Sequence, residues 1–142
     1  MDLSGVEPNA YKAMYALSNY VENSGLTKLH SELIKIRASQ INGCAFCLDM
    51  HTKAAIKLGE TTQRIFLLNA WPETDLFTEE EKIILGLTEQ ITLVNQHGID
   101  DELYQQAVAA FGENYVAKII MAIVTINGWN RIAISTKMEV PK

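Results

Sequence analysis

The apolar residues of this chain recur three and four positions apart along almost its whole length, and this period restricts the fold to an all-α one. No segment shows the alternation of apolar and polar residues that marks a half-buried strand. Glycine and proline residues separate the periodic segments, as they do at helix ends. The sequence therefore predicts a bundle of about seven helices, at approximately residues 9–23, 27–42, 44–59, 61–70, 78–98, 100–112 and 113–132.

The last predicted helix is apolar on nearly every side, from Val116 to Ile126. A helix without a polar face is buried on more than one side, so we expect it at the centre of the bundle or in a contact between subunits. A seven-helix monomer has little room to cover every apolar face. We therefore expect a homo-oligomer.

Length and composition limit the class of protein. We expect residues 1–142 to form one domain with its own core. Hydrophobic residues make up 48% and charged residues 20%, which excludes disorder, and the net charge of −5 leaves no basic surface for nucleic acid. The N-terminus lacks the pattern of a secretory signal, and the longest uncharged run, Ile119–Asn130, is short for a membrane span. We expect a cytoplasmic protein.

Both cysteines of the chain, Cys44 and Cys47, lie in the third predicted helix, and His51 follows one turn later. In a reducing cytoplasm a close cysteine pair is more often catalytic or metal-binding than structural. The three residues share one face of the helix, and it is the apolar face. Side chains four positions apart have Cβ atoms roughly 5–6 Å apart, so His51 can reach Cys47 directly or through one water. Cys44 is two turns away from His51, roughly 11 Å of rise.

Glu32 lies at the edge of the buried stripe of the preceding predicted helix. If these two helices fold back on each other at Asn42–Gly43, residue 32 comes level with about residue 53, close to His51. The spacing thus predicts a line from Glu32 through His51 to the cysteines. In this line the carboxylate orients and charges the imidazole, and the imidazole takes the thiol proton.

Helix geometry alone leaves open which of the two thiols is the more reactive. The helix N-terminus favours a thiolate at Cys44, whereas the relay favours Cys47. We choose Cys47, because a base in reach both removes the proton and positions the sulfur. A thiol redox site cycles between two thiols and a disulfide. We expect Cys44 to lie nearer the surface and to exchange with a partner dithiol that reopens the disulfide.

Other interpretations of these residues remain open. Buried cysteines can be inert parts of a core. Glu32 can simply pair with Lys28 or Lys35 on its own helix. The 12-residue offset from Glu32 to Cys44 favours the relay.

Zinc is the alternative with the sharpest chemistry, because a Cys-x2-Cys pair begins many zinc sites. With His51 as the third ligand, the fourth ligand would be His30, His97 or Glu32. His51 follows the cysteines too closely for the usual finger spacing, and no second cysteine pair exists, so we expect no metal. Attached haem would need histidine directly after the second cysteine, where Leu48 stands, and we expect no cofactor.

The full pattern Glu-x11-Cys-x2-Cys-x3-His is carried by Glu32, Cys44, Cys47 and His51. It resembles the alkylhydroperoxidase AhpD-like branch of the carboxymuconolactone decarboxylase family. The resemblance continues in LLNAWPETDLFTEEEKIILGLTEQITL (residues 67–93) and in NGWNRIAIS (residues 127–135). It covers roughly residues 29–135, most of the chain.

This resemblance implies an all-helical, AhpD-like bundle built on a helical hairpin that carries the Cys-x-x-Cys. It implies a peroxidase that reduces hydroperoxides through a dithiol/disulfide cycle, with Glu32 and His51 as the proton relay. Cys47 would become the sulfenic acid, and Cys44 would resolve it. The resemblance also implies trimers or hexamers, and a dithiol, lipoyl-type or peroxiredoxin partner.

Other members of the same superfamily suggest different functions for this fold. Its decarboxylases lack the paired cysteines, so the pair disfavours lactone decarboxylation here. The alternative functions are a thiol–disulfide oxidoreductase and a non-catalytic module of the same fold that binds a ligand or a metal. The complete set of four residues separates the enzyme from such a module, because a scaffold does not need it.

Overall fold

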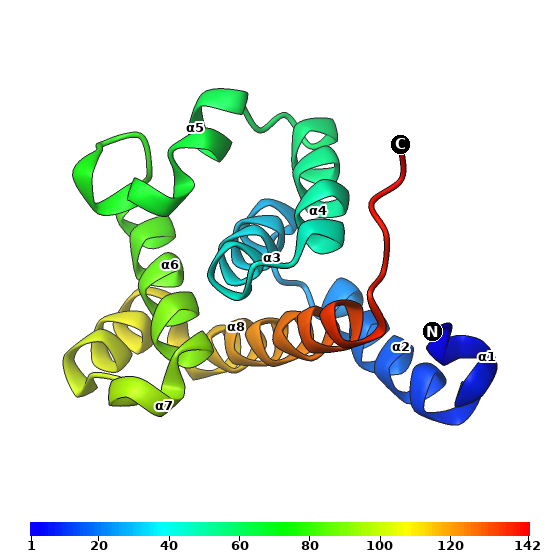
Figure 1. Ribbon diagram of the computed structural model, residues 1–142. Coiled ribbons are helices and arrows are strands. Elements are labelled where there is room, and N and C mark those ends of the chain that lie inside the picture. Colours follow the sequence, from blue (N-terminus) through cyan, green and yellow to red (C-terminus); the bar gives the residue numbers. More distant parts are fainter.

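The computed structural model describes all 142 residues, and its only regular secondary structure is helical (Figure 1). This confirms the predicted all-α class. The elements in chain order are α1 (Leu3–Val6), α2 (Pro8–Asn23), α3 (Lys28–Asn42), α4 (Ala45–Lys57), α5 (Thr62–Phe66), the 3₁₀-helix η1 (Leu68–Glu73), α6 (Glu79–Thr92), α7 (Val94–His97) and α8 (Asp101–Thr136).

The number of helices is nine, so the expected number of about seven is wrong. The additional elements α1, η1 and α7 have only four to six residues, too few to show a 3.6-residue period. In the other direction, the last two predicted helices join in the single element α8. The predicted break falls within it at Gly112, whose non-helical φ of 76° and ψ of 157° kink α8 into two helical segments.

Helix α8 lies across the molecule, and α2, α3, α4 and α6 pack against it (Figure 1). Its residues Ile119, Ile123 and Ile126 are buried with side chains of α3 and α6 in the largest hydrophobic cluster. The most apolar segment of the chain therefore lies at the centre of the bundle. Val124, which is 46% exposed, marks a side of α8 that no other element covers.

By length and composition, α8 is the one helix of this chain that could cross a membrane. The helix is bent at Gly112, and its apolar residues share a core with α3 and α6. The core helix of a soluble protein meets the same two criteria. The apolar character of α8 is therefore no ground for a membrane assignment.

Helices α3 and α4 form the predicted hairpin and pack along each other. Gly43 ends α3 in the left-handed conformation, with φ 69°, which a residue with a side chain rarely adopts. Cys44 follows as the N-cap of α4, and its backbone N–H donates to the carbonyl oxygen of Ser39 over 3.0 Å. The turn thus places the first cysteine directly at the start of α4.

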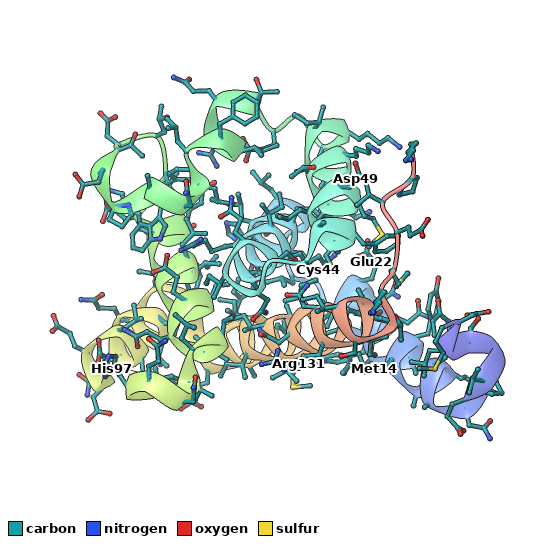
Figure 2. All side chains as sticks on the ribbon, viewed as in Figure 1. Met14, Glu22, Cys44, Asp49, His97 and Arg131 are labelled. Atoms are coloured by element: carbon teal, nitrogen blue, oxygen red, sulfur yellow. A yellow bond between two sulfur atoms is a disulfide. The ribbon has the colours of Figure 1, made fainter.

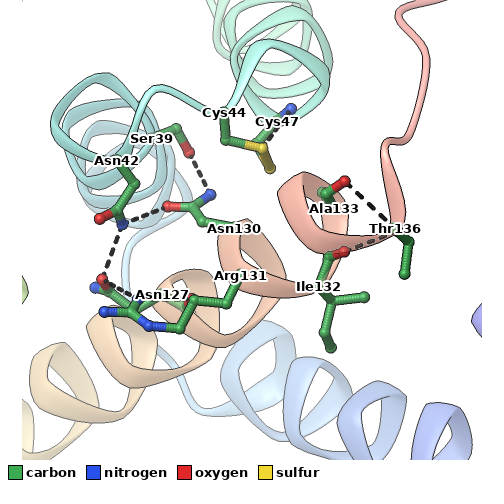
Figure 3. Close-up of a disulfide and its surroundings, with 10 residues drawn as sticks. All are labelled: Ser39, Asn42, Cys44, Cys47, Asn127, Asn130, Arg131, Ile132, Ala133 and Thr136. Atoms are coloured by element: carbon green, nitrogen blue, oxygen red, sulfur yellow. Dashed lines mark hydrogen bonds between the residues drawn. A yellow bond between two sulfur atoms is a disulfide. The ribbon is translucent and has the colours of Figure 1, made fainter.

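A network of amide side chains ties this turn to α8 (Figure 3). Asn42 Nδ2 donates to the Oδ1 atoms of Asn127 and Asn130, in both cases over 2.9 Å. Asn130, which is fully buried, donates from Nδ2 to Ser39 Oγ over 2.9 Å. Asn130 therefore holds two positions in the last turn of α3, immediately before the cysteines.

We expect Asn130→Ala to lower the free energy of unfolding by about 2–4 kcal/mol, because it leaves the buried Ser39 hydroxyl without its partner and opens a cavity. Asn23→Ala is the matched control, since the Asn23 amide is exposed and bonds only to the carbonyl oxygen of Asn19. Urea unfolding of both variants measures the difference. Equal stability of the two variants would show that the network does not hold the turn.

Candidate active site

The two cysteines lie at the N-terminal end of α4, in the interior of the molecule (Figures 2 and 3). They form a disulfide, with Cα atoms 5.3 Å apart. Their side chains pack against Ala133 of α8, with Phe46 alongside. The backbone N–H of Cys47 points at Cys44 Sγ over 3.3 Å, so the start of the helix directs a donor at this sulfur.

The expectation that Cys44 lies nearer the surface is wrong. Cys44 is 1% exposed and Cys47 is 2% exposed, because the hairpin turn folds the start of α4 down onto Ala133. The two sulfurs differ in another respect. Cys47 lines a cavity of about 670 Å³, which is described below and called the large cavity, and Cys44 does not.

Glu32 and His51 meet across the hairpin, as the spacing predicts. The carboxylate Oε2 of Glu32, on α3, lies 3.0 Å from Nδ1 of His51, on α4. An ionised carboxylate only accepts hydrogen bonds, so Nδ1 carries the hydrogen and donates it. In the neutral ring this leaves Nε2 as the nitrogen with a free lone pair. His51 lines the same cavity as Cys47, one helical turn away along α4.

The alternative partner of Glu32 is present as well. Lys35 Nζ donates to Oε1 of the same carboxylate over 3.0 Å. The two interpretations of Glu32, as a partner of the imidazole and as a partner of a lysine on its own helix, therefore hold together. Oε2 accepts the hydrogen bond from His51, and Oε1 accepts the one from Lys35.

The carboxylate of Glu32 is almost completely buried, at 8% exposure. Burial raises the pKa of Glu32, but the hydrogen bond from His51 and the charge of Lys35 outweigh it, and the net result is a lowered pKa. Glu32 is therefore a buried anion at neutral pH, held by two donors.

A cavity of about 670 Å³ opens beside Cys47 and His51, between α2, α4 and the C-terminal part of α8. Most of its lining is apolar or aromatic, and the large side chains include Tyr11, Tyr15, Phe46, Met50, Ile126, Trp129 and Ile132. Trp129 is fixed within this wall, because its Nε1 donates to Ser18 Oγ over 2.6 Å and its ring meets Tyr11 edge to face. The chamber is large enough for a small organic molecule.

Sequence reasoning missed the lining of this cavity. Trp129 and Tyr11 come from opposite ends of the chain, and no local pattern links them. The only available signal was the pair Tyr11 and Tyr15, which lie four positions apart on one face of α2.

A second cavity of about 200 Å³ lies beside Glu32, and Glu22, Lys28, Ser31 and Lys57 also line it. The hydroxyl of Ser31 is buried there without a hydrogen-bond partner in the protein. Glu32 thus faces the small cavity, whereas its partners Lys35 and His51 face the large one.

The two remaining histidines, considered above as zinc ligands, lie elsewhere. His30 Nδ1 hydrogen-bonds with the hydroxyl of Tyr115 over 2.9 Å, and burial lowers the pKa of His30. His97 lies at the end of α7, at the left edge of Figure 2 and away from Cys44, which is labelled near the middle of that view. No three histidine, cysteine, aspartate or glutamate side chains converge on one point in this structure.

Known proteins share this hairpin fold. A model of the carboxymuconolactone decarboxylase family matches residues 8–90, more than half of the chain. The chain belongs to this family.

Individual members are similar over different lengths. YdfG of Bacillus subtilis, an uncharacterised protein, is 45% identical over 92% of this chain and 88% of its own. Alkyl hydroperoxide reductase AhpD of Streptomyces coelicolor is 36% identical over 48% of this chain and 40% of its own. A crystal structure of an Agrobacterium tumefaciens protein of unknown function, considered a candidate antioxidant defence protein AhpD, has a TM-score of 0.97 at 40% identity and covers 100% of this chain and 97% of that one. The resemblance to AhpD and the AhpD-like fold are confirmed.

The lowered pKa of Glu32 predicts a contribution to stability that depends on pH. This contribution is present above the ordinary value of 4.5 and is lost as the pH falls below it, through the lowered pKa. The difference in unfolding free energy between the wild type and Glu32→Gln should therefore shrink as the pH falls below 4.5. Urea unfolding at pH 7, 5 and 3.5 measures it. Other carboxyl groups titrate in both proteins and cancel, and a difference that stays constant with pH would contradict the assignment.

Proposed function

We propose that this protein is a thiol-dependent peroxidase, which reduces organic hydroperoxides through a dithiol/disulfide cycle of Cys44 and Cys47. The observation that carries the proposal is the imidazole of His51, oriented by Glu32 and exposed to the same cavity as Cys47. A structural cysteine pair needs neither a base nor a chamber. Similarity to proteins named AhpD supports the same activity.

The cycle begins with the reduced protein. Nε2 of His51 takes the proton of the Cys47 thiol, and the thiolate attacks the terminal oxygen of the hydroperoxide. The S–O bond forms as the O–O bond breaks, and the leaving alkoxide receives the proton from His51. The products are an alcohol and a sulfenic acid at Cys47. The ionised carboxylate of Glu32 stabilises the imidazolium that forms between these two proton transfers.

Cys44 completes the oxidative half of the cycle. Its thiol attacks Cys47 Sγ, the hydroxyl of the sulfenic acid leaves as water, and the disulfide seen in the structure results. The N-cap position holds Cys44 one turn from Cys47, so the resolving sulfur needs no large movement. This order assigns peroxide attack to Cys47, the one of the two cysteines that lines the cavity.

A dithiol donor restores the thiols. Both cysteines are buried, so a donor approaches Cys47 through the cavity, and exchange does not take place at a Cys44 nearer the surface. Attack on Cys47 releases the Cys44 thiolate, which the N–H of Cys47 stabilises, and the second donor thiol then closes the donor's own disulfide. A slender arm of lipoyl type fits this route, while a folded peroxiredoxin partner would require the cavity wall to open.

The lining of the cavity indicates the class of peroxide. Hydrogen peroxide needs no chamber, whereas a cavity of about 670 Å³ with a mainly apolar and aromatic wall suits an organic group attached to the hydroperoxide.

A steady supply of dithiol donor is found in a reducing compartment, which supports a cytoplasmic location.

We expect Cys47→Ser to abolish the consumption of cumene hydroperoxide with dihydrolipoamide as the donor, because it removes the attacking sulfur. Without a donor, Cys44→Ser should instead consume one equivalent of peroxide and stop with a sulfenic acid at Cys47, because no second thiol is left to resolve it. Peptide mass spectrometry after treatment with a dimedone probe locates that acid. Full turnover by Cys47→Ser would refute the assignment. Exchange with dithiols but no reaction with any peroxide would favour a thiol–disulfide oxidoreductase.

We also propose that the protein forms a homo-oligomer, a trimer or a hexamer. Val124 and Ile134 on α8 and Tyr15 on α2 are each about half exposed, which leaves large apolar side chains in water on the single chain. Sedimentation equilibrium at micromolar concentration should therefore give a mass of three or six chains of 15.9 kDa each. A mass of one chain across the concentration range would contradict the proposal, and Val124→Lys should shift an oligomer toward smaller species.

A further inference from the structure

The Glu32–His51 pair continues into a third group on the cavity wall. Lys35 Nζ lies 3.0 Å from Oε1 of Glu32 and 3.9 Å from Oε2 of Glu22, which belongs to α2. Side-chain exposure is 17% for Lys35 and 10% for Glu32. The lysine lines the large cavity together with Cys47 and His51. The Lys35 side chain therefore lies between the Glu32 carboxylate and the proposed reaction chamber, and it is mostly buried.

We propose that Lys35 is a positioning residue of the proposed peroxidase, which holds the Glu32 carboxylate toward His51 and balances its charge so that the imidazole stays available as a base. This proposal rests on the proposed function, since it concerns the base of that reaction. It assigns to Lys35 a part in the proton relay.

Balance of charge is the physical reason for the assignment. A buried carboxylate with one neutral imidazole as its only partner has two ways to lower its energy. It can take up a proton itself, which ends its role as an acceptor, or it can draw a proton onto the imidazole and form an ion pair. Both outcomes remove the neutral, correctly oriented ring. A cation on the second oxygen stabilises the anion without either transfer.

The charged groups around this centre leave Lys35 as the one cation in contact with Glu32. Lys28 and Lys57 line the small cavity beside Glu32, but neither forms an ion pair with it. Glu22 approaches Lys35 only to 3.9 Å and is 53% exposed, so it moderates the ammonium charge weakly. From the C-terminal end of α8, Lys137 lines the large cavity and has no ion pair with Glu32 or His51.

The chain contains a lysine–glutamate pair of the same spacing that serves as a control. Lys82 and Glu79 are also three positions apart and 2.9 Å from each other, but Glu79 is 88% exposed at the start of α6. Such an exposed pair contributes little to stability or to any neighbouring group. Substitution at Lys82 therefore reproduces the loss of a lysine without the loss of a buried charge.

The test compares Lys35→Met and Lys35→Gln, which remove the charge, with Lys35→Arg, which keeps it, and with Lys82→Met. The ring signals of ¹⁵N-labelled His51 are followed by NMR from pH 5 to 9 in the full-length reduced protein. The rate of cumene hydroperoxide turnover is measured over the same range. Circular dichroism verifies that each variant is folded. If Lys35→Met does not fold, Lys35→Gln alone supplies the comparison without the lysine charge.

We expect the imidazolium form of His51 to persist to a pH about one unit higher in Lys35→Met and Lys35→Gln, because an opposite charge at this distance has been removed from the carboxylate. The pH below which peroxide turnover falls off should move up by the same amount. At a fixed pH on the acid side, the rate should therefore be about tenfold lower than in the wild type. Lys35→Arg should restore both curves, and Lys82→Met should follow the wild type.

Two results separate the possible failures. If the uncharged variants give His51 and turnover curves that coincide with the wild type, Lys35 has only a structural role and the inference is wrong. If the wild type consumes no peroxide, the proposed function fails. The NMR titration still decides in that case whether Lys35 controls the charge state of His51.

Discussion

The candidate site depends on one hydrogen bond, between the buried carboxylate of Glu32 and Nδ1 of His51. It joins the two helices of the hairpin one helical turn beyond Cys47, and it determines which nitrogen of the ring is free. A buried carboxylate is costly unless donors satisfy it. In this site Lys35 and His51 each satisfy one oxygen, so the anion is retained and directed toward the imidazole.

The rest of the fold keeps this arrangement in place and controls access to it. Helix α8 holds the end of α3 through the hydrogen bond from Asn130 to Ser39, and Ala133 of α8 packs against the disulfide. Because both cysteines are buried and only Cys47 lines the large cavity, the proposed cycle brings substrate and reductant along one route to Cys47. The proposed dithiol cycle thus depends on the packing as well as on the identity of the residues.

The sequence predicted well those features that depend on neighbours along the chain. The hairpin turn at Gly43 and the meeting of Glu32 with His51 follow from helix spacing, although the estimated register, residue 53, was two residues too far. Features that depend on distant contacts escaped it. The burial of Cys44 is imposed by α8, and the cavity wall pairs Tyr11 with Trp129. Spacing alone makes Lys35 a rival of His51 for Glu32, because it does not show that one carboxylate can bond both groups.

The central claim is that His51, oriented by Glu32, is the base for Cys47. Its most direct test is the single-turnover reaction of reduced Cys44→Ser with an organic hydroperoxide, followed by stopped flow with and without His51→Ala. Removal of the base should slow formation of the sulfenic acid by about 10²–10⁴-fold at pH 7. Rates that agree within about twofold would contradict the account.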